Sequence, residues 1–321
     1  MLLLNQIREN YASVLTGLQK RNIPNAQVLL DQAIALDDRR KSSQTERDQL
    51  QAEANALSKL IGQLMKEGKK EEAEAVKAKT GEIKSQIKKL EEENSLAEES
   101  LKALLYTIPN VPHSSVPAGK SAEDNELVLE YGSIPSLFEG KLPHWELIKK
   151  YDIIDFDLGV KITGAGFPVY KGKGARLQRA LINFFLDEAL RAGFVEVQPP
   201  ILVNEDSGYG TGQLPDKEGQ MYHATVDNLY LIPTAEVPIT NLYRDVILSE
   251  DELPIRNVGY TPCFRREAGS WGAHVRGLNR LHQFDKVEIV QITHPDHSYL
   301  GGNERLCSGT FAKIRTSLSG T

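Results

Sequence analysis

A heptad repeat in the first third of the chain most restricts what this sequence can fold into. Over residues 29–64, and again over 76–104, mainly apolar residues recur at alternating steps of four and three. This spacing keeps one stripe on a single helix face and is typical of a coiled coil. Gly68 lies between the two runs, and glycine readily takes the backbone conformations that end a helix. The sequence therefore predicts an antiparallel two-helix hairpin over about residues 27–105, with its tip near Gly68.

Polar residues interrupt the predicted seam of this hairpin. Arg40, Ser43 and Arg47 fall on one stripe and Asn94 on the other, and polar seam residues can fix the register at a cost in stability. Lysines that would meet phosphates gather toward the tip, namely Lys59, Lys66, Lys69, Lys70, Lys77 and Lys79. From the pattern alone, a spacer or a dimerisation coil with a solvated charged face is an equally good interpretation.

The composition is that of an ordinary globular protein. The 321 residues, 40% hydrophobic and 26% charged, are enough for two domains and a sizeable core. The net charge of −6 gives no indication of nucleic-acid binding, which would have to rest on local basic patches. Cys263 and Cys307 are too few for a disulfide framework or a cysteine-rich zinc site, and the first ten residues fit neither a signal peptide nor a membrane span. We expect a protein of the reducing cytoplasm, with no membrane partner.

The character of the chain changes after residue 107. A proline-rich stretch begins at Ile108 and predicts an extended linker over residues 108–125. Beyond it, residues 177–190 predict a long amphipathic helix. Short β-branched or aromatic segments predict strands at 194–197, 229–232, 258–260 and 286–291.

These elements together predict the fold class and the domain organisation. A long helix beside short strands is typical of an α+β domain built on an antiparallel sheet flanked by helices. The predicted order is a helical domain over residues 1–107, the linker over 108–125, the α+β domain over 126–299 and a tail over 300–321. No glycine-rich phosphate loop of the P-loop or Rossmann type occurs, so a nucleotide would be bound in another way.

The segment over residues 264–288 carries the most chemistry. It predicts a strand, a loop with three glycines and a return strand, with Arg265 and Glu267 on one strand face and Phe284 and Glu288 on the return strand. Arginine grips phosphate, a buried carboxylate accepts hydrogen bonds from an adenine or an ammonium group, and an aromatic ring stacks on a base. The spacing by itself favours a charged surface hairpin with a surface salt bridge.

The literal strings point further. Phe264-Arg-x-Glu267, the glycine loop and His282-Gln-Phe-x-Lys-Val-Glu288 resemble motif 2 of the class II seryl-tRNA synthetases. The segment Pro233-Thr-Ala-Glu-Val-Pro-Ile-Thr240 resembles the Thr-Ala-Glu element that binds serine in that family. The helix over residues 177–190 with Val195-Glu-Val-Gln-Pro-Pro200 resembles motif 1 at the dimer interface. The N-terminal hairpin resembles the tRNA-binding arm of that family, and the resemblance runs from Met1 to about Tyr299.

The resemblance implies an ATP site. Arg265, as the catalytic residue, would hold the α-phosphate and the carboxylate of serine. Glu267 would contact adenine, and Phe284 would stack on it. Arg266 and Leu281 would also line this site. Leu281 stands where the family usually has valine, and Arg266 stands where it commonly has a small or polar residue.

The resemblance also implies a serine site. Thr234, Ala235, Glu236, Arg265 and Glu288 would form it, with the carboxylates pairing with the ammonium and hydroxyl groups of serine. A site that hydrogen-bonds a hydroxyl rejects alanine strongly, because alanine leaves buried polar groups unpaired.

The implied reaction is the ligation of serine to tRNA(Ser), and by resemblance also to tRNA(Sec), through seryl-adenylate. ATP and Mg²⁺ would be required, although no metal ligand can be assigned in the sequence. The coiled-coil arm and the loop from Gly269 to Asn279 would contact the tRNA, and the protein would be a homodimer.

The resemblance stops after Tyr299. Motif 3, which supplies an arginine for the γ-phosphate in this family, is not found in residues 300–321. A reading-frame shift near Tyr299 would account for the tail, because codons for residues 306–321 read one base later can encode an amphipathic helix and a strand. We therefore expect a truncated or frame-shifted sequence. The motif 2 strands would lack sheet neighbours, so we expect this chain to aggregate and to have little or no aminoacylation activity.

Three other interpretations stay open at this level. A non-catalytic synthetase paralogue would bind tRNA or an amino acid, although the intact Arg265, Glu236 and Glu288 argue against a loss of catalysis. A coiled-coil interaction protein would give the Thr-Ala-Glu and His-Gln-Phe elements no role. Synthetases for threonine, proline or histidine share the class II fold but have no N-terminal two-helix arm.

Overall fold

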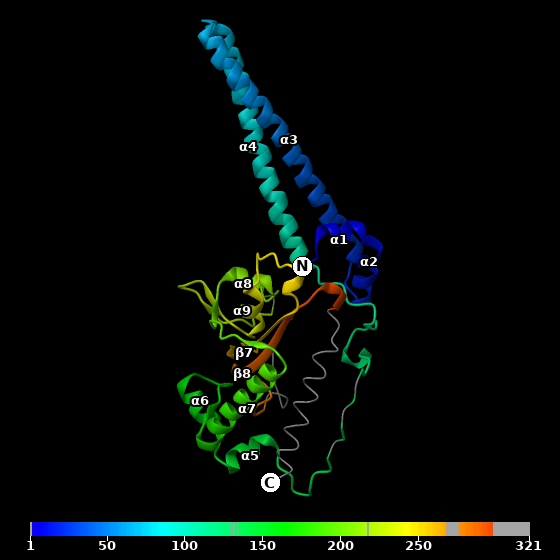
Figure 1. Cartoon of the computed structure of the whole chain (residues 1–321), viewed down its shortest axis with the longest axis vertical. Coiled ribbons are helices and arrows are strands. Elements are labelled where there is room, and N and C mark those ends of the chain that lie inside the picture. Colours follow the sequence, from blue (N-terminus) through cyan, green and yellow to red (C-terminus); the bar gives the residue numbers. More distant parts are fainter. Residues whose placement is uncertain are drawn as a thin grey trace. The chain divides into compact units, whose positions relative to one another are not determined.

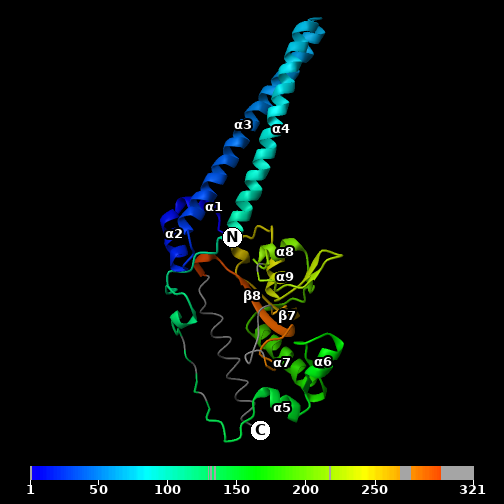
Figure 2. The same ribbon diagram turned by 180° about the vertical axis from the view of Figure 1, so that it is seen from behind.

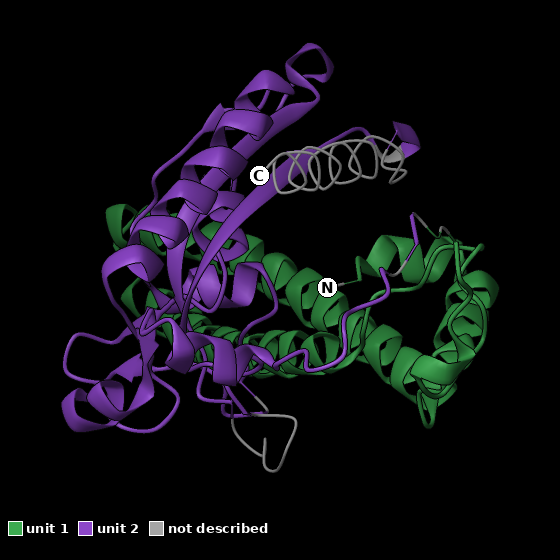
Figure 3. Cartoon of the chain, turned by 90° about the horizontal axis from the view of Figure 1, so that it is seen from below, with its two compact units in different colours: residues 1–130 green, residues 131–321 purple. Residues whose placement is uncertain are grey.

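The computed structural model has two compact units, residues 1–130 and 131–321 (Figure 3). It describes residues 2–128, 130, 132–133, 135–216, 218–267 and 276–297. Most of the predicted loop from Gly269 to Asn279, Cys307 and the whole predicted tail over residues 300–321 lie outside the described residues. The frame-shift hypothesis therefore stays a prediction.

The first unit is helical (Figure 1). Its helices are α1 (Leu4–Glu9), α2 (Tyr11–Lys20), α3 (Ala26–Lys66) and α4 (Lys70–Thr107). Gly68 lies in the turn between α3 and α4 with a φ of +77°, a left-handed conformation that glycine adopts without strain. The predicted antiparallel hairpin and its tip are therefore confirmed.

The packing of α3 against α4 follows the predicted heptads. The seam positions of both helices are buried or half-buried, including the polar Arg40, Ser43 and Asn94. Near the base of the arm, α1 and α2 join α3 and α4 in one apolar core that includes Ile7, Leu18 and Leu30. A second apolar cluster, around Ala54, Ile83 and Ile87, lies farther along the arm.

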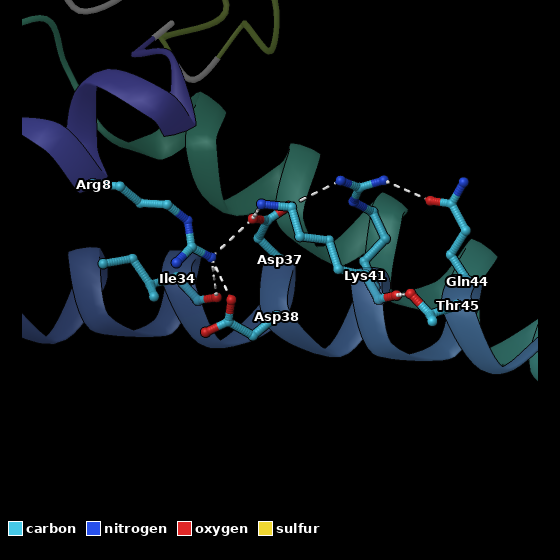
Figure 4. Close-up of polar contacts among 8 residues, drawn as sticks. Arg8, Ile34, Asp37, Asp38, Lys41, Gln44 and Thr45 are labelled. Carbon is cyan, nitrogen blue, oxygen red and sulfur yellow. Dashed lines mark hydrogen bonds and ion pairs between the residues drawn. The ribbon is translucent and has the colours of Figure 1, made fainter.

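Asp37 of α3 is a buried carboxylate surrounded by cations (Figure 4). Asp37 is only 2% exposed. It forms ion pairs with Arg8 at 2.8 Å, Arg40 at 3.0 Å and Lys41 at 2.8 Å. Burial alone would raise the pKa of this carboxyl, but the hydrogen bonds from Lys41, Arg40 and Arg8 outweigh it and lower the pKa. Arg8 also pairs with Asp38 at 2.5 Å, so the cluster joins α1 to α3.

The predicted linker over residues 108–125 contains one short helix in its described part, the 3₁₀ helix η1 (Ala122–Asp124). Ser121 and Asp124 cap this helix reciprocally, because the Ser121 side chain accepts from the backbone of η1 and Asp124 accepts from the Ser121 N–H.

The second unit is an α+β domain, as predicted (Figure 2). Its described helices are α5 (His144–Lys150), α6 (Phe156–Ile162), α7 (Gly172–Arg191), α8 (Glu205–Gly210), α9 (Glu236–Asn241), η2 (Glu250–Glu252) and η4 (Pro295–His297). One small sheet consists of β1 (Ile154–Asp155) and β2 (Val169–Tyr170). A second has the strand order β4 (Leu202–Val203), β6 (Leu229–Leu231) and β5 (His223–Ala224).

A third sheet carries the segments singled out in the sequence. Its order is β3 (Val195–Glu196), β7 (Ile255–Phe264) and β8 (Gln283–Ile292). The strands β7 and β8 pair antiparallel with Gly259 opposite Glu288, whereas β3 runs parallel to β7. The antiparallel pair of β7 and β8 agrees with the predicted antiparallel sheet, and β3 adds a parallel strand at the edge of β7.

The helix α7, which contains the predicted helix over residues 177–190, packs on this sheet. Ala189 on α7 forms an apolar cluster with Phe194 and Val258, flanked by Val287 and Ile289 of β8. Because strand residues alternate between faces, Val287 and Ile289 turn toward α7 and the even-numbered residues of β8 lie on the opposite face. That opposite face holds Phe284, Lys286 and Glu288.

Candidate functional site

The candidate site begins where β7 ends. The Arg265 N–H donates to the His282 carbonyl at 2.9 Å, so Arg265 still follows the line of the strand. The Arg266 N–H donates instead to the Gln220 carbonyl at 2.8 Å, and Glu267 has a left-handed φ of +48°. The prediction that Arg265 and Glu267 share one strand face is wrong. After Arg265 the chain no longer pairs with the β8 side, and Arg266 pairs instead with the segment that contains Gln220.

Arg265 lies between the sheet and the Thr-Ala-Glu segment. Its guanidinium lies over the Phe284 ring, 5.1 Å from the ring centroid, and its Nε donates to the Pro233 carbonyl at 3.3 Å. The structure therefore brings together the two residues that the resemblance assigns to phosphate and adenine, and places both beside the segment that it assigns to serine.

Thr234 and Glu288 form the centre of a polar cluster. The Thr234 hydroxyl donates to Glu288 Oε2 at 2.5 Å, and the Glu236 N–H donates to the same oxygen at 3.1 Å. Thr234 and Ala235 are buried at the start of α9, which places the first helical N–H group of α9 at the carboxylate. The Glu236 side chain is exposed, so only its backbone joins the cluster.

Lys286 completes this cluster and was not among the residues singled out in the sequence. Its ammonium donates to Glu288 Oε1 at 2.7 Å and to Thr234 Oγ1 at 2.8 Å. Lys286 and Glu288 are two residues apart on β8 and therefore share a face. The period-two spacing within Phe284-x-Lys286-x-Glu288 was the signal that could have identified it. We call Thr234, Lys286 and Glu288 the β8 cluster.

The remaining predicted ATP-site residues lie around this centre with other partners. Glu267 pairs with Arg280 at 2.9 Å, and its side chain is only 9% exposed. The Arg266 guanidinium lies over the Tyr222 ring at 5.9 Å from the centroid. Leu281 is buried.

His282 connects the end of β8 to two neighbouring segments. Its N–H donates to the Gly166 carbonyl at 2.9 Å, and its Nδ1 lies 2.6 Å from the Tyr222 hydroxyl. A side chain at Gly166 would collide with the His282 ring, so glycine is required for this approach. Burial raises the pKa of Tyr222, against the nearby charge of Arg266, which lowers it.

The face of β8 that carries the odd-numbered residues is anchored on α7. Asp285 accepts a hydrogen bond from the Tyr260 hydroxyl at 2.6 Å and another from the Gln178 amide on α7. Burial, together with the hydrogen bond to Asp285 and its charge, raises the pKa of Tyr260 to about 12. Tyr260 therefore stays protonated at neutral pH and serves as a donor that holds β7 and β8 in position.

Neither a metal site nor a membrane span is found in the described part of the chain. Over the described ranges, no group of three or more His, Cys, Asp or Glu side chains is arranged to hold a metal ion. Among the described helices, none is long and apolar enough to cross a membrane.

Comparison with known proteins decides the family. Residues 1–112 match the family described as the seryl-tRNA synthetase N-terminal domain, and residues 221–311 match the tRNA synthetase class II core domain (G, H, P, S and T). The serine–tRNA ligase of Salinibacter ruber is 49% identical over 299 residues, which cover 93% of this chain and 70% of that protein. The chain belongs to the seryl-tRNA synthetase family.

Other members of the seryl-tRNA synthetase family agree with this assignment. The serine–tRNA ligase of Carboxydothermus hydrogenoformans is 45% identical over 300 residues, with the same coverage of 93% and 70%. The crystal structure of seryl-tRNA synthetase from Pyrococcus horikoshii, complexed with ATP, superposes with a TM-score of 0.79 at 32% identity. The match covers 93% of this chain and 71% of that one.

A more distant member shares the fold. The cytoplasmic serine–tRNA ligase from Naegleria fowleri, in complex with AMP, superposes with a TM-score of 0.78 at 24% identity, covering 99% of this chain and 73% of that one. Membership of the seryl-tRNA synthetase family argues against a free-standing coiled-coil interaction protein and against a synthetase for threonine, proline or histidine.

Proposed function

We propose that this chain is a serine–tRNA ligase, which activates serine with ATP and transfers it to the 3′ adenosine of tRNA(Ser), and also of tRNA(Sec). The observation that carries the proposal is the β8 cluster beside Arg265. It places a carboxylate, a hydroxyl and an ammonium within hydrogen-bond distance of one another next to an arginine that lies over an aromatic ring.

The β8 cluster has the groups that recognise serine. The Glu288 carboxylate accepts hydrogen bonds from an ammonium or a hydroxyl, and Thr234 both donates and accepts. Serine would take over hydrogen bonds that these side chains now make with one another. Alanine would leave at least one of these buried groups unpaired, which is costly in a partly buried site. Ala235 and Glu236 would complete the site, with the exposed Glu236 carboxylate turning toward the bound ammonium.

Arg265 is positioned to act on both reactants. Its Nε is held by the Pro233 carbonyl, and its Nη groups project from that fixed point. They would bind an α-phosphate oxygen and the serine carboxylate and stabilise charge in the transition state. A serine carboxylate oxygen attacks the α-phosphorus and the bond to pyrophosphate breaks. In the second step the 3′ hydroxyl of the tRNA attacks the acyl carbon and AMP leaves.

Four further residues would line the ATP site in this proposal. Phe284 would stack on adenine. The Glu267 carboxylate would leave its ion pair with Arg280 and contact the same base. Arg266 and Leu281 would lie at the edges of the site. Mg²⁺ would accompany the ATP phosphates.

The arm and the loop from Gly269 to Asn279 would bind the tRNA. The six lysines near the tip are exposed, which supports phosphate contact. Lys69, Lys77 and Lys79 also pair with Glu67, Glu74 and Glu53, so part of the charge is already balanced. A location in the cytoplasm is part of the proposal, as expected for the family.

A homodimer is supported by the motif 1 elements. Apolar side chains are exposed on α7 and β3, with Leu177 at 55%, Leu181 at 39% and Val195 at 64% exposed. Exposed apolar side chains on these elements would be covered in an interface. Sedimentation velocity of the chain and of Leu181→Glu tests it. A dimer that becomes a monomer on substitution supports the proposal, and a monomeric wild-type chain contradicts it.

Serine-dependent exchange of pyrophosphate with ATP, measured across amino acids, tests the activity. The 321 residues themselves are expected to exchange weakly, because motif 3 of the family is not among them. The measurement therefore compares this chain with one extended by the C-terminal region of a relative. Exchange with serine alone supports the proposal, whereas exchange driven by threonine or by no amino acid contradicts it.

A further inference from the structure

A short stretch of chain just before β8 is attached to α5 by three separate contacts. This stretch, residues 276–278, which we call the return limb, precedes β8 in the chain. The Leu278 N–H donates to His144 Nε2 at 2.9 Å. The Arg276 guanidinium lies over the Trp145 ring, 5.1 Å from its centroid. A side chain at Gly277 would collide with the His144 ring.

The chemistry of these contacts is specific. An imidazole nitrogen accepts the Leu278 N–H only while it is unprotonated, so His144 acts here as a neutral acceptor. Gly277 has a φ of +74°, and only a residue without a Cβ both adopts this conformation readily and lets the imidazole approach the backbone. His144 and Trp145 are adjacent on α5 with ring centroids 5.0 Å apart, edge to face, so the two rings hold neighbouring parts of the limb.

The attachment lies beside a space that is partly open to solvent. A cavity of about 430 Å³ lies beside it, lined by Trp145, Lys149, Asp155, Arg276 and Gly277 among others. Beside this space the limb is held by the hydrogen bond, the stacked guanidinium and the close approach at Gly277.

We propose that His144 and Trp145 are positioning residues that anchor the return limb and so set where β8 begins. Arg280 follows the anchored Leu278 by two residues and pairs with Glu267, the carboxylate assigned to adenine. Leu281 and His282 follow directly, and the His282 carbonyl accepts the Arg265 N–H. A limb held on α5 therefore holds the backbone partner of Arg265 and the pair that contains Glu267. The consequence for ATP rests on the proposed function.

Hydrogen–deuterium exchange at the Leu278 amide tests the anchor directly. His144→Ala removes the acceptor and is expected to raise the exchange rate of this amide about tenfold, the effect of losing one hydrogen bond. His144→Gln keeps an acceptor oxygen at a similar reach and is expected to bring the rate back to within about threefold of wild type. Glu146→Ala, an exposed change on the same helix, should leave the rate unchanged.

Gly277→Ala tests the same contact from the side of the return limb, because the added Cβ would collide with the His144 ring. It is expected to release the same amide, and the double variant with His144→Ala should add little, because both changes break one contact. Melting temperatures show that each variant is folded. Unchanged exchange at Leu278 in folded His144→Ala, or no rescue by Gln, overturns the anchor.

ATP affinity, measured by calorimetry on the same variants, tests the consequence. Weaker binding by His144→Ala with recovery in His144→Gln supports positioning. Unchanged affinity together with a released amide overturns it. If ATP is not bound even by the wild-type chain extended with the C-terminal region of a relative, the proposed function fails and the exchange result alone decides the anchor.

Discussion

At the scale of single residues, this chain arranges charged groups by giving each one a small number of fixed partners. Lys286 and Glu288 illustrate this at the site, and Asp37 illustrates it in the arm. In both places a partly or fully buried carboxylate is held by cations and by hydrogen-bond donors from more than one element. Such carboxylates depend on these fixed partners, because an unpaired buried charge is costly.

Lys286→Met is expected to weaken the binding of a non-hydrolysable seryl-adenylate analogue about tenfold or more. Lys286 donates to both Glu288 and Thr234, so its loss removes two charge-assisted hydrogen bonds that orient the serine-binding groups. Calorimetry measures the change. Lys173→Met, an exposed lysine of α7, is the matched control. Equal affinity of Lys286→Met and wild type would show that Lys286 does not orient the cluster.

Asp37→Asn is expected to destabilise the first unit by about 2 kcal/mol at pH 7, because it leaves three cations without their carboxylate. The pKa of Asp37 is lowered by folding, so the ionised form contributes stability above its unfolded pKa. That contribution is lost as the pH falls below about 4 and through the lower folded pKa. Thermal unfolding of wild type and variant should differ at pH 7 and converge near pH 2. A constant difference at both pH values contradicts this account.

How far the sequence predicts these residues depends on the kind of pattern involved. Strand parity correctly predicts that Phe284 and Glu288 share a face, and it could have predicted Lys286. Parity fails for Glu267, because it does not tell where β7 ends, and that end depends on the Gln220 carbonyl, from a segment distant in sequence. The contacts of His144 and Gly277 were also not predictable, since they join segments more than 130 residues apart that share no repeat.

At the scale of elements, the hairpin of α3 and α4 shows how much a heptad repeat determines. The repeat predicted both helices, the seam and the tip. The repeat did not predict that the buried Asp37 would join α1 to α3, because Asp37 lies outside the heptad positions. In the second unit, β7 and β8 extend beyond the predicted strands, since pairing along ten residues continues where the local sequence is less β-branched.

Two glycines of the arm are expected to respond in opposite directions to the same substitution. Gly68→Ala places a Cβ at φ +77° and should destabilise the arm by about 1 kcal/mol. Gly62→Ala lies in the interior of α3 with open space around it and should stabilise the arm by up to about 1 kcal/mol. Urea unfolding followed by circular dichroism measures both. A stabilising Gly68→Ala would contradict the described turn.

At the scale of the whole molecule, the chain joins two units with separate tasks. The helical unit presents an arm with exposed lysines, and the α+β unit gathers Arg265, Phe284 and the β8 cluster at one sheet face. The match to Salinibacter ruber serine–tRNA ligase covers 93% of this chain and 70% of that protein, and it includes both units. The family and the order of motifs could be inferred from the sequence, whereas the network around the β8 cluster needed the structure.

We propose above that the β8 cluster beside Arg265 recognises serine. The most direct test is calorimetric binding of two non-hydrolysable adenylate analogues, one seryl and one alanyl, to the 321-residue chain. We expect the seryl analogue to bind at least about a hundredfold more tightly, because only its hydroxyl satisfies the polar groups of the cluster. Equal affinity for the two analogues, or tighter binding of the alanyl analogue, would contradict it.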